Sequence, residues 1–353
     1  MWQVIGQTRA LSLLQRSLET GSLAHAYLFV GPAHVGKMTL ALNLAQALNC
    51  EAAEPPCGKC ASCQKVASAK HADVQIIGLS HNADSAEAKS RVEISIDHIR
   101  QIQHSASLPP FEGKYKVFII DEAELLSNEA ANCFLKTLEE PIGKVVFMLL
   151  TANEQLLPMT VLSRCQRLEL LPLASTEVEA ALSSSWDIEP QKAKLLARLS
   201  HGCLGWAVSA AIDDSLFQQR AEYLDELLDI ISADCEERFA YAAQLVAKFS
   251  QNRGLVWERL NLWLNFWRDI LLIKVGLSDN ITNVDRLSTL INIAGERGLA
   301  QIKAFISSIL VAEDQLKQNA SPRLVLDRLM LSIPETEIHG ERNPDVQVEV
   351  NYG

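Results

Sequence analysis

The chain has 353 residues, enough for two or three domains, and its 48% hydrophobic and 21% charged residues are ordinary for a globular protein. Its 32 basic and 43 acidic residues give a net charge of -11, which argues against a protein coated in nucleic acid but not against a local basic patch. The amino terminus lacks a signal-peptide pattern, and the most apolar late segment, residues 257–277, carries five charged side chains. No membrane span is therefore expected, and a cytoplasmic location is the default.

The first 170 residues alternate between buried-strand patterns and amphipathic helix patterns. Strands are expected at 26–30, 74–79, 116–120, 145–150 and 167–170, and helices at 37–49, 95–108 and 127–140. Ser95 and Ser127 are the expected caps of the last two helices, and Pro141 follows the end of the third. Strands that alternate with helices predict a mostly parallel sheet covered on both faces.

The pattern after residue 170 predicts helices alone. Short ones are expected at 175–186, 190–202 and 205–214, and longer ones at 215–232, 236–250, 254–276, 283–297, 299–317 and 321–332. The helix at 254–276 carries an aromatic stripe of Trp257, Trp263, Phe266 and Trp267. Few basic residues lie among these rings, so we expect them to pack in a core or subunit contact rather than stack on bases. The tail from residue 335 has little periodicity and is expected to be loosely ordered.

The stretch GPAHVGKMT contains the phosphate-loop pattern G-x-x-x-x-G-K. Gly31 and Gly36 supply the turn, and Lys37 is positioned to reach a nucleotide's β- and γ-phosphates. The pattern then requires Ser or Thr as a magnesium ligand, but this position holds Met38, whose thioether is a poor ligand for so hard an ion. Thr39 follows it. A glycine turn that only joins a strand to a helix is the alternative.

An acidic pair closes the apolar strand KVFII. In phosphate-loop ATPases, the acid at this strand end supports magnesium and its neighbour polarises water, which gives these roles to Asp121 and Glu122. The alternative is a pair that caps the following helix. The phosphate-loop match earlier in the chain favours a joint site.

Four of the eight cysteines lie within the stretch CEAAEPPCGKCASC. Cys50, Cys57, Cys60 and Cys63 have the spacing C-x6-C-x2-C-x2-C, which suits a tetrahedral all-thiolate zinc site. Four protein ligands leave no open position, so the zinc would be structural. Four free thiols on an oxidation-prone loop are the alternative.

A last candidate is Arg164, in the stretch LLPMTVLSRCQRLEL before the final strand. Taken alone, an arginine at this place is an ordinary surface partner for an acidic residue.

The chain resembles the bacterial clamp-loader proteins of the AAA+ family in four stretches taken together. These are AHAYLFVGP, CGKCASC, KVFIIDEAELLSNEAANCFLKTLEEP and LPMTVLSRCQ. The resemblance covers residues 1 to about 210. It implies an α/β AAA+ core at 1–170 with a zinc module inserted at about 50–63, a helical lid at 171–213, an all-α collar at 214–335 and a tail at 336–353.

The resemblance also implies a function. Such subunits form five-membered rings of tau/gamma motor subunits, delta and delta prime, and the ring places the sliding clamp of DNA polymerase III on primed DNA. The family's Ser-Arg-Cys motif supplies an arginine finger to ATP on the neighbouring subunit, a role that falls on Arg164 here.

Departures from the motor subunit favour the delta prime branch, with weak or absent ATP hydrolysis. Met38 replaces the magnesium hydroxyl, Gly205 stands where the motor carries a γ-phosphate-sensing arginine, the segment after Asp121 has the delta prime style, and the chain stops near the end of the collar. An active tau/gamma-type ATPase stays open, with Thr39 or water replacing the missing ligand, because the rest of the loop is intact. An AAA+ scaffold unrelated to replication is the third reading.

Overall fold

The structure, a computed structural model, describes residues 2–78, 93–139, 143–251, 253–318 and 320–335. The chain divides into two compact units, Met1–Arg220 and Ala221–Gly353. The predicted tail at 336–353 and the predicted helix stop at Pro141 lie outside the described residues.

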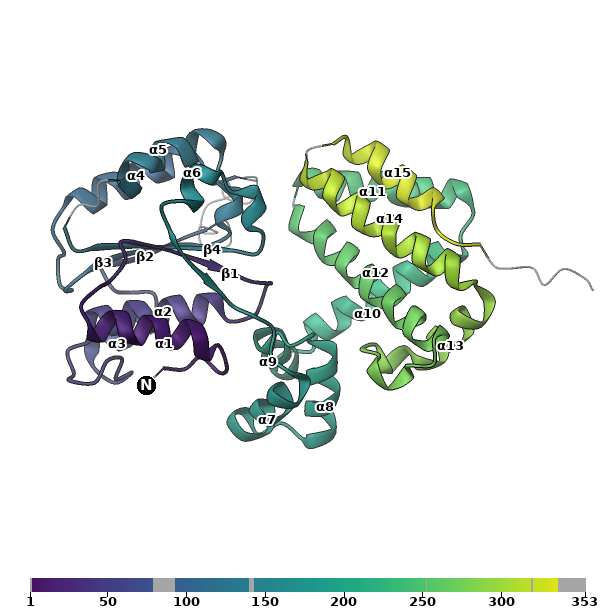
Figure 1. Ribbon diagram of the computed structural model, residues 1–353, viewed down its shortest axis with the longest axis horizontal. Coiled ribbons are helices and arrows are strands. Elements are labelled where there is room, and N and C mark those ends of the chain that lie inside the picture. Colours follow the sequence, from purple (N-terminus) through teal and green to yellow (C-terminus); the bar gives the residue numbers. More distant parts are fainter. Residues whose placement is uncertain (1, 79–92, 140–142, 252, 319, 336–353) are drawn as a thin grey trace, which may run out of the picture. The chain divides into compact units, whose positions relative to one another are not determined.

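The first unit is built on a five-stranded sheet with the strand order β2-β3-β4-β1-β5 (Figure 1). Every neighbouring pair of strands is parallel. The strands are β1 (Ala26–Val30), β2 (Val74–Ile77), β3 (Lys116–Ile120), β4 (Val145–Thr151) and β5 (Gln166–Glu169). The predicted α/β core with a parallel five-stranded sheet is thereby confirmed.

Helices cover both faces of this sheet (Figure 1). One face carries α1 (Thr8–Glu19), α2 (Lys37–Asn49) and α3 (Ala61–Ala67), and the other carries α4 (Ile96–Ser107), α5 (Asn128–Glu139) and α6 (Met159–Leu162). Because successive strand residues point to opposite faces, Tyr27 and Phe29 of β1 join the first apolar cluster while Leu28 joins the second.

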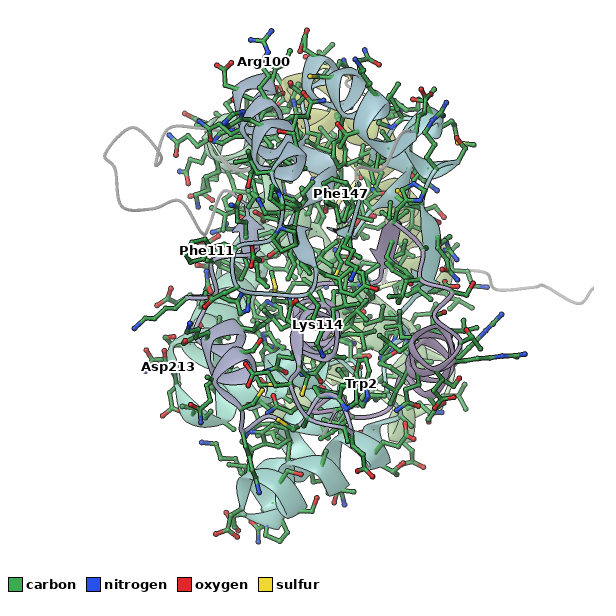
Figure 2. All side chains as sticks on the ribbon, turned by 90° about the vertical axis from the view of Figure 1, so that its left-hand side faces the viewer. Trp2, Arg100, Phe111, Lys114, Phe147 and Asp213 are labelled. Carbon is green, nitrogen blue, oxygen red and sulfur yellow. The ribbon has the colours of Figure 1, made fainter. Side chains whose placement is uncertain are left out.

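Aromatic rings fill the second layer. The Phe147 ring of β4 lies deep between the sheet and α5 (Figure 2), edge-on to Phe134 with ring centroids 5.2 Å apart and stacked on Phe118 at 5.4 Å. Ser127 acts as the predicted cap, since its Oγ accepts a hydrogen bond from the Ala130 N–H at 3.1 Å. Ser95 is the residue before α4, and its backbone N–H donates to His98 Nδ1 at 3.3 Å.

Helices α1 and α3 were not predicted. Helix α1 is clearly amphipathic, with Ala10 and Leu14 buried and Leu11 and Leu18 packed against the same apolar cluster, so its pattern was present in the sequence and was overlooked. Helix α3 has seven residues and lies among the cysteines, where the metal-site spacing dominates the pattern.

Three short helices complete the first unit: α7 (Ser175–Trp186), α8 (Pro190–Leu199) and α9 (Leu204–Ile212). They share an apolar cluster of their own that includes Val178, Leu182 and Leu196. Since the compact units divide at residue 220, treating these helices as a separate lid domain stays a prediction.

The second unit is all-helical, and no strand follows β5 in the part of the chain that the structure describes. Helix α10 (Ser215–Ser232) crosses the boundary between the units, and α11 (Cys235–Gln251), α12 (Arg253–Lys274), α13 (Leu287–Glu296), α14 (Leu299–Lys317) and α15 (Pro322–Leu331) follow. Trp263, Phe266 and Trp267 are fully buried, which confirms the predicted packing role of the aromatic stripe.

Helix α13 begins at Leu287, four residues after the predicted start at 283. The residues before it form the 3-10 helix η5 (Val284–Arg286), which leads directly into α13. The fully buried Asp269 carboxylate accepts hydrogen bonds from the backbone N–H groups of Thr282 at 2.9 Å and Asn283 at 2.7 Å, and so fixes the turn that precedes η5.

Among the described helices, none has the length and apolar composition that a membrane crossing would require.

Candidate functional site

The glycine-rich loop, residues 31–36, joins the buried strand β1 to α2 at the carboxyl edge of the sheet. A Cβ at Gly31 would lie 2.5 Å from the Leu170 carbonyl oxygen, so close approach of the β5 backbone requires glycine there. Gly36 has a φ of 108°, a backbone conformation that only glycine adopts easily. The two glycines of the loop are therefore required for different reasons, Gly31 by the close approach of another backbone segment and Gly36 by its positive φ.

Lys37 contacts the loop itself. Its Nζ donates hydrogen bonds to the carbonyl oxygens of Gly31 at 2.6 Å and Pro32 at 2.8 Å. Burial lowers the pKa of Lys37, while the charges of Glu124 and Asp121 act in the opposite direction. The loop is thus closed on its own lysine, and a bound phosphate would have to draw the ammonium away from these carbonyls.

Met38 and Thr39 differ in their surroundings. Met38 is half-buried and packs against the apolar cluster that contains Leu40 and Leu44 of the same helix, whereas Thr39 is exposed. An apolar side chain engaged with the core offers no hard ligand to a cation.

Three carboxylates follow β3. The Asp121 N–H donates to the Ile77 carbonyl oxygen at 2.8 Å, and Asp121 Oδ1 accepts from the Glu122 N–H at 3.0 Å. Burial raises the pKa of Glu122, and the neighbouring negative charges of Asp121 and Glu124 raise it further.

Glu124 was missed by the sequence reasoning. It lies in the 3-10 turn η2 (Ala123–Leu125), and its Oε1 accepts a hydrogen bond from the Ala152 N–H after β4 at 3.1 Å. Its other oxygen, Oε2, is buried without a hydrogen-bond partner among the described residues. The available signal was the spacing D-E-x-E, since one tight turn brings the second glutamate back to the strand end. Asp121, Glu122, Glu124 and Lys37 therefore share one electrostatic environment.

Helix α9 contacts the glycine-rich loop directly. The Gly205 N–H donates to the His34 carbonyl oxygen at 2.9 Å, and a Cβ at Gly205 would lie 2.7 Å from that same oxygen. The thiol of Cys203, just before α9, lies close enough to Lys37 for the lysine's charge to lower its pKa, although burial dominates and raises it. Glycine at 205 therefore lets the backbone of α9 meet the loop where any side chain would intrude.

Arg164 lies apart from this cluster of groups. It follows the short helix α6, and its Nη1 donates to the Thr160 carbonyl oxygen at 2.8 Å and to Ser163 Oγ at 3.3 Å. Its Nη2 forms an ion pair with Glu139 at the end of α5. Within the described part of the chain, these hydrogen bonds all go to α5, α6 and Ser163, and none goes to the glycine-rich loop.

The four clustered cysteines converge as the spacing predicts. Their Sγ atoms all lie within 4.8 Å of one another, and those of Cys57 and Cys63 are 4.0 Å apart. Four thiolates about 2.3 Å from a zinc ion would be about 3.8 Å apart, so only a small contraction separates the cluster from a tetrahedral metal shell. The donor set fits a metal ion of the zinc type.

Backbone N–H groups surround these sulfur atoms. Cys57 Sγ accepts hydrogen bonds from the N–H groups of Lys59 at 3.4 Å and Cys60 at 3.3 Å, and these bonds lower the pKa of the Cys57 thiol to about 6. Cys60 Sγ likewise accepts from the Cys63 N–H at 3.4 Å. Donors aimed at sulfur favour the thiolate form that binds metal.

Polar contacts tie the cysteine cluster to α2 and to the loop before β3. Cys50 ends α2, and its carbonyl oxygen accepts a hydrogen bond from Lys114 Nζ at 2.6 Å (Figure 2 labels Lys114). The buried Gln46 side chain donates to the Cys63 carbonyl oxygen at 3.0 Å. These bonds fix the first and last cysteine relative to the core.

Comparison with known proteins gives consistent matches. The family model described as "DNA polymerase III, delta subunit" matches residues 6–174. DNA polymerase III subunit delta' of Bacillus subtilis is 28% identical over 330 residues, which cover 93% of this chain and 96% of that protein. DNA polymerase III subunit tau of Escherichia coli is 33% identical over 276 residues, which cover 73% of this chain but only 41% of tau.

Solved structures give a weaker likeness. A DNA polymerase III gamma subunit-related protein from Thermotoga maritima superposes with a TM-score of 0.43 at 19% identity, covering 92% of this chain and 98% of that one. At this level the fold assignment rests on the strand order of the chain itself.

Proposed function

The chain belongs to the clamp-loader family of bacterial DNA polymerase III subunits that includes delta prime and tau/gamma, and we propose that it acts as a subunit of delta prime type. In this role it joins tau/gamma motor subunits and delta in a hetero-pentameric ring, through the helical unit at the carboxyl end. The ring helps to place the sliding clamp on primed DNA. The delta prime assignment is supported by a similarity that extends over nearly the whole length of both chains.

The subunit hydrolyses ATP weakly or not at all. The observation that carries this proposal is Met38, which replaces the magnesium-binding hydroxyl and packs against the core. The lysine engaged with loop carbonyls and the close contact of Gly205 with His34 agree with it.

The catalytic contribution of the chain is Arg164, offered to ATP on a neighbouring motor subunit. An arginine supplied in trans stabilises the charge that develops on the transferred phosphoryl group. The site residues of this chain keep lesser roles: Gly31, Gly36, Lys37 and Thr39 form the remnant of a phosphate site, and Asp121 and Glu122 its acidic half. Zinc held by the four cysteines is structural.

The test substitutes Arg164→Ala in a complex reconstituted with the tau/gamma and delta subunits of the same organism. Hydrolysis at the adjoining motor site is expected to fall by about 10³-fold, because an arginine finger contributes that much or more. Single-turnover hydrolysis in the presence of clamp and primed DNA measures it.

Arg167→Ala is the matched control. Arg167 lies three residues away in β5 and forms an exposed ion pair with Glu154, so its removal leaves hydrolysis unchanged. Gel filtration verifies that each variant still assembles. Full hydrolysis by the assembled Arg164→Ala complex would refute the proposed role.

An active tau/gamma-type ATPase is the second candidate. Its support is the gathering of Lys37, Asp121 and Glu124 in one electrostatic environment beside intact loop glycines. Turnover of Mg-ATP by the purified chain, abolished by Lys37→Ala, would favour this second function over the first.

A further inference from the structure

The ion pair between Arg164 and Glu139 joins two elements that are 25 positions apart in the sequence. Glu139 is the last residue of α5, and Arg164 follows α6. The Arg164 side chain is 32% exposed and the Glu139 side chain 49% exposed, so the pair lies at the surface while the Arg164 Nε is buried. The guanidinium is therefore anchored along one edge and accessible along another.

The position of Glu139 is unfavourable for α5 alone. The free carbonyl groups in the last turn of a helix carry partial negative charge, which repels an acidic side chain and attracts a cation. Lys136 in the same turn has the favourable sign, and Glu139 has the unfavourable one. The Arg164 guanidinium offsets this repulsion, since it forms an ion pair with the Glu139 carboxylate.

The contacts of Arg164 leave its guanidinium little freedom to rotate. Nη1 donates to the Thr160 carbonyl oxygen at 2.8 Å and to Ser163 Oγ at 3.3 Å, while Nη2 is held by Glu139. The first two partners belong to the same short segment as Arg164 and move with it. Glu139 is the contact that fixes the guanidinium relative to the sheet-packed helix α5.

We propose that Glu139 is the positioning residue for Arg164, which it holds in one orientation before ATP on the neighbouring subunit arrives. This inference rests on the proposed function, because it assigns Glu139 a role through the arginine finger. An oriented side chain loses less conformational freedom when it meets the transition state, so the benefit belongs to hydrolysis rather than to stability. An exposed ion pair of this kind stabilises a fold only slightly.

The experiment is a double-mutant cycle in the reconstituted complex, with Glu139→Ala, Glu139→Gln, Arg164→Ala and the two double variants. Glu139→Ala should lower the single-turnover rate at saturating ATP by about 3- to 10-fold with KM unchanged, because ordering of one long side chain is lost. Glu139→Gln keeps the length and a hydrogen-bond acceptor, so it should recover part of the rate. In the Arg164→Ala background, neither change at 139 should have any further effect.

Glu129→Ala provides the control, since Glu129 is exposed in the first turn of the same helix and should leave the rate unchanged. Thermal unfolding of each chain alone verifies its fold. If Arg164→Ala lowers hydrolysis but both Glu139 variants hydrolyse normally, or lower the rate equally without Arg164, the positioning role is overturned and the arginine finger stands. If Arg164→Ala itself hydrolyses normally, both the finger and its positioning are overturned.

Discussion

Single residues carry the difference between a phosphate-site remnant and a working ATPase in this chain. Gly31 and Gly36 are required by the geometry of the loop itself, one by the Leu170 carbonyl and the other by its positive φ. The two glycines therefore account for the conformation of the loop, and they do not by themselves indicate that the loop binds a nucleotide. Met38 bears on nucleotide binding and hydrolysis, because magnesium binding depends on the chemistry of the side chain at this one position.

Restoring the missing hydroxyl at position 38 tests whether its absence weakens the site. Met38→Thr adds one hydroxyl ligand, and the dissociation constant for ATP in the presence of Mg²⁺ is expected to improve by about 10-fold, or about 1.4 kcal/mol. Calorimetric titration with and without EDTA measures it, and the gain should vanish when Mg²⁺ is removed.

Met159→Thr is the control, because Met159 is 76% exposed and lies in α6. An unchanged affinity in Met38→Thr would mean that the closed loop, rather than the missing ligand, weakens the site.

Among the elements, the loop at 108–114 donates three of its hydrogen bonds to one carboxylate. Asp73, just before β2, is only 3% exposed, and its oxygens accept hydrogen bonds from the N–H groups of Phe111, Glu112 and Gly113 at 2.7, 2.8 and 2.7 Å. The loop is held firmly although the Phe111 ring is 86% exposed and points away from the molecule (Figure 2).

The pKa of Asp73 sets the pH dependence of this attachment. Burial raises it, but the three N–H donors together outweigh burial, so the folded-state pKa lies below the usual value. Because the folded pKa is depressed, the stabilisation is complete above the unfolded pKa of about 3.9 and is lost as the pH falls through the lower folded value.

Asp73→Asn should lower the free energy of unfolding at pH 7 by about 1.5–3 kcal/mol, because three bonds to a charged acceptor are weakened. Urea unfolding between pH 7 and pH 3 measures the difference, which should shrink at the acidic end. Asp97→Asn, at a side chain 76% exposed, should change stability by less than about 1 kcal/mol. A difference between Asp73→Asn and the unaltered chain that is independent of pH would contradict the assignment.

The cysteine cluster is the second element with a measurable consequence. We expect one zinc ion for each chain, bound by the four thiolates, and metal analysis of the purified protein measures it. Chelation or Cys60→Ser should lower the Tm by several degrees, at about 2–4 °C for each kcal/mol in a unit of this size.

Loss of zinc should increase hydrogen exchange mainly at residues 50–67, because hydrogen bonds from Gln46 and Lys114 hold the edges of the cluster without metal. Cys235→Ser, at an exposed cysteine outside the cluster, should retain the zinc. A chain purified without metal and with an unchanged Tm after chelation would speak against the site.

At the scale of the whole molecule, the two units differ in what the sequence reveals of them. The sheet of the first unit follows from five apolar strands separated by helices, and all five lie where the pattern predicts. The helices of the second unit were predicted nearly to their ends, except that the 3-10 helix η5 replaces the first turn of α13 after a segment held by the buried Asp269. A capping carboxylate 14 residues away leaves no mark in local periodicity.

By itself the sequence determined the features that depend on spacing along the chain: the parallel-sheet core, the glycine-rich loop, the acidic strand end and the cysteine cluster. Only the tertiary structure decided that Lys37 turns back onto the loop, that Gly205 meets His34, that Glu124 joins the acidic pair and that Glu139 holds Arg164. The physical reason is the separation along the sequence of the residues that come into contact. Local spacing fixes which face of a helix or strand a residue occupies, whereas contacts between distant elements follow from how the sheet and its helices pack.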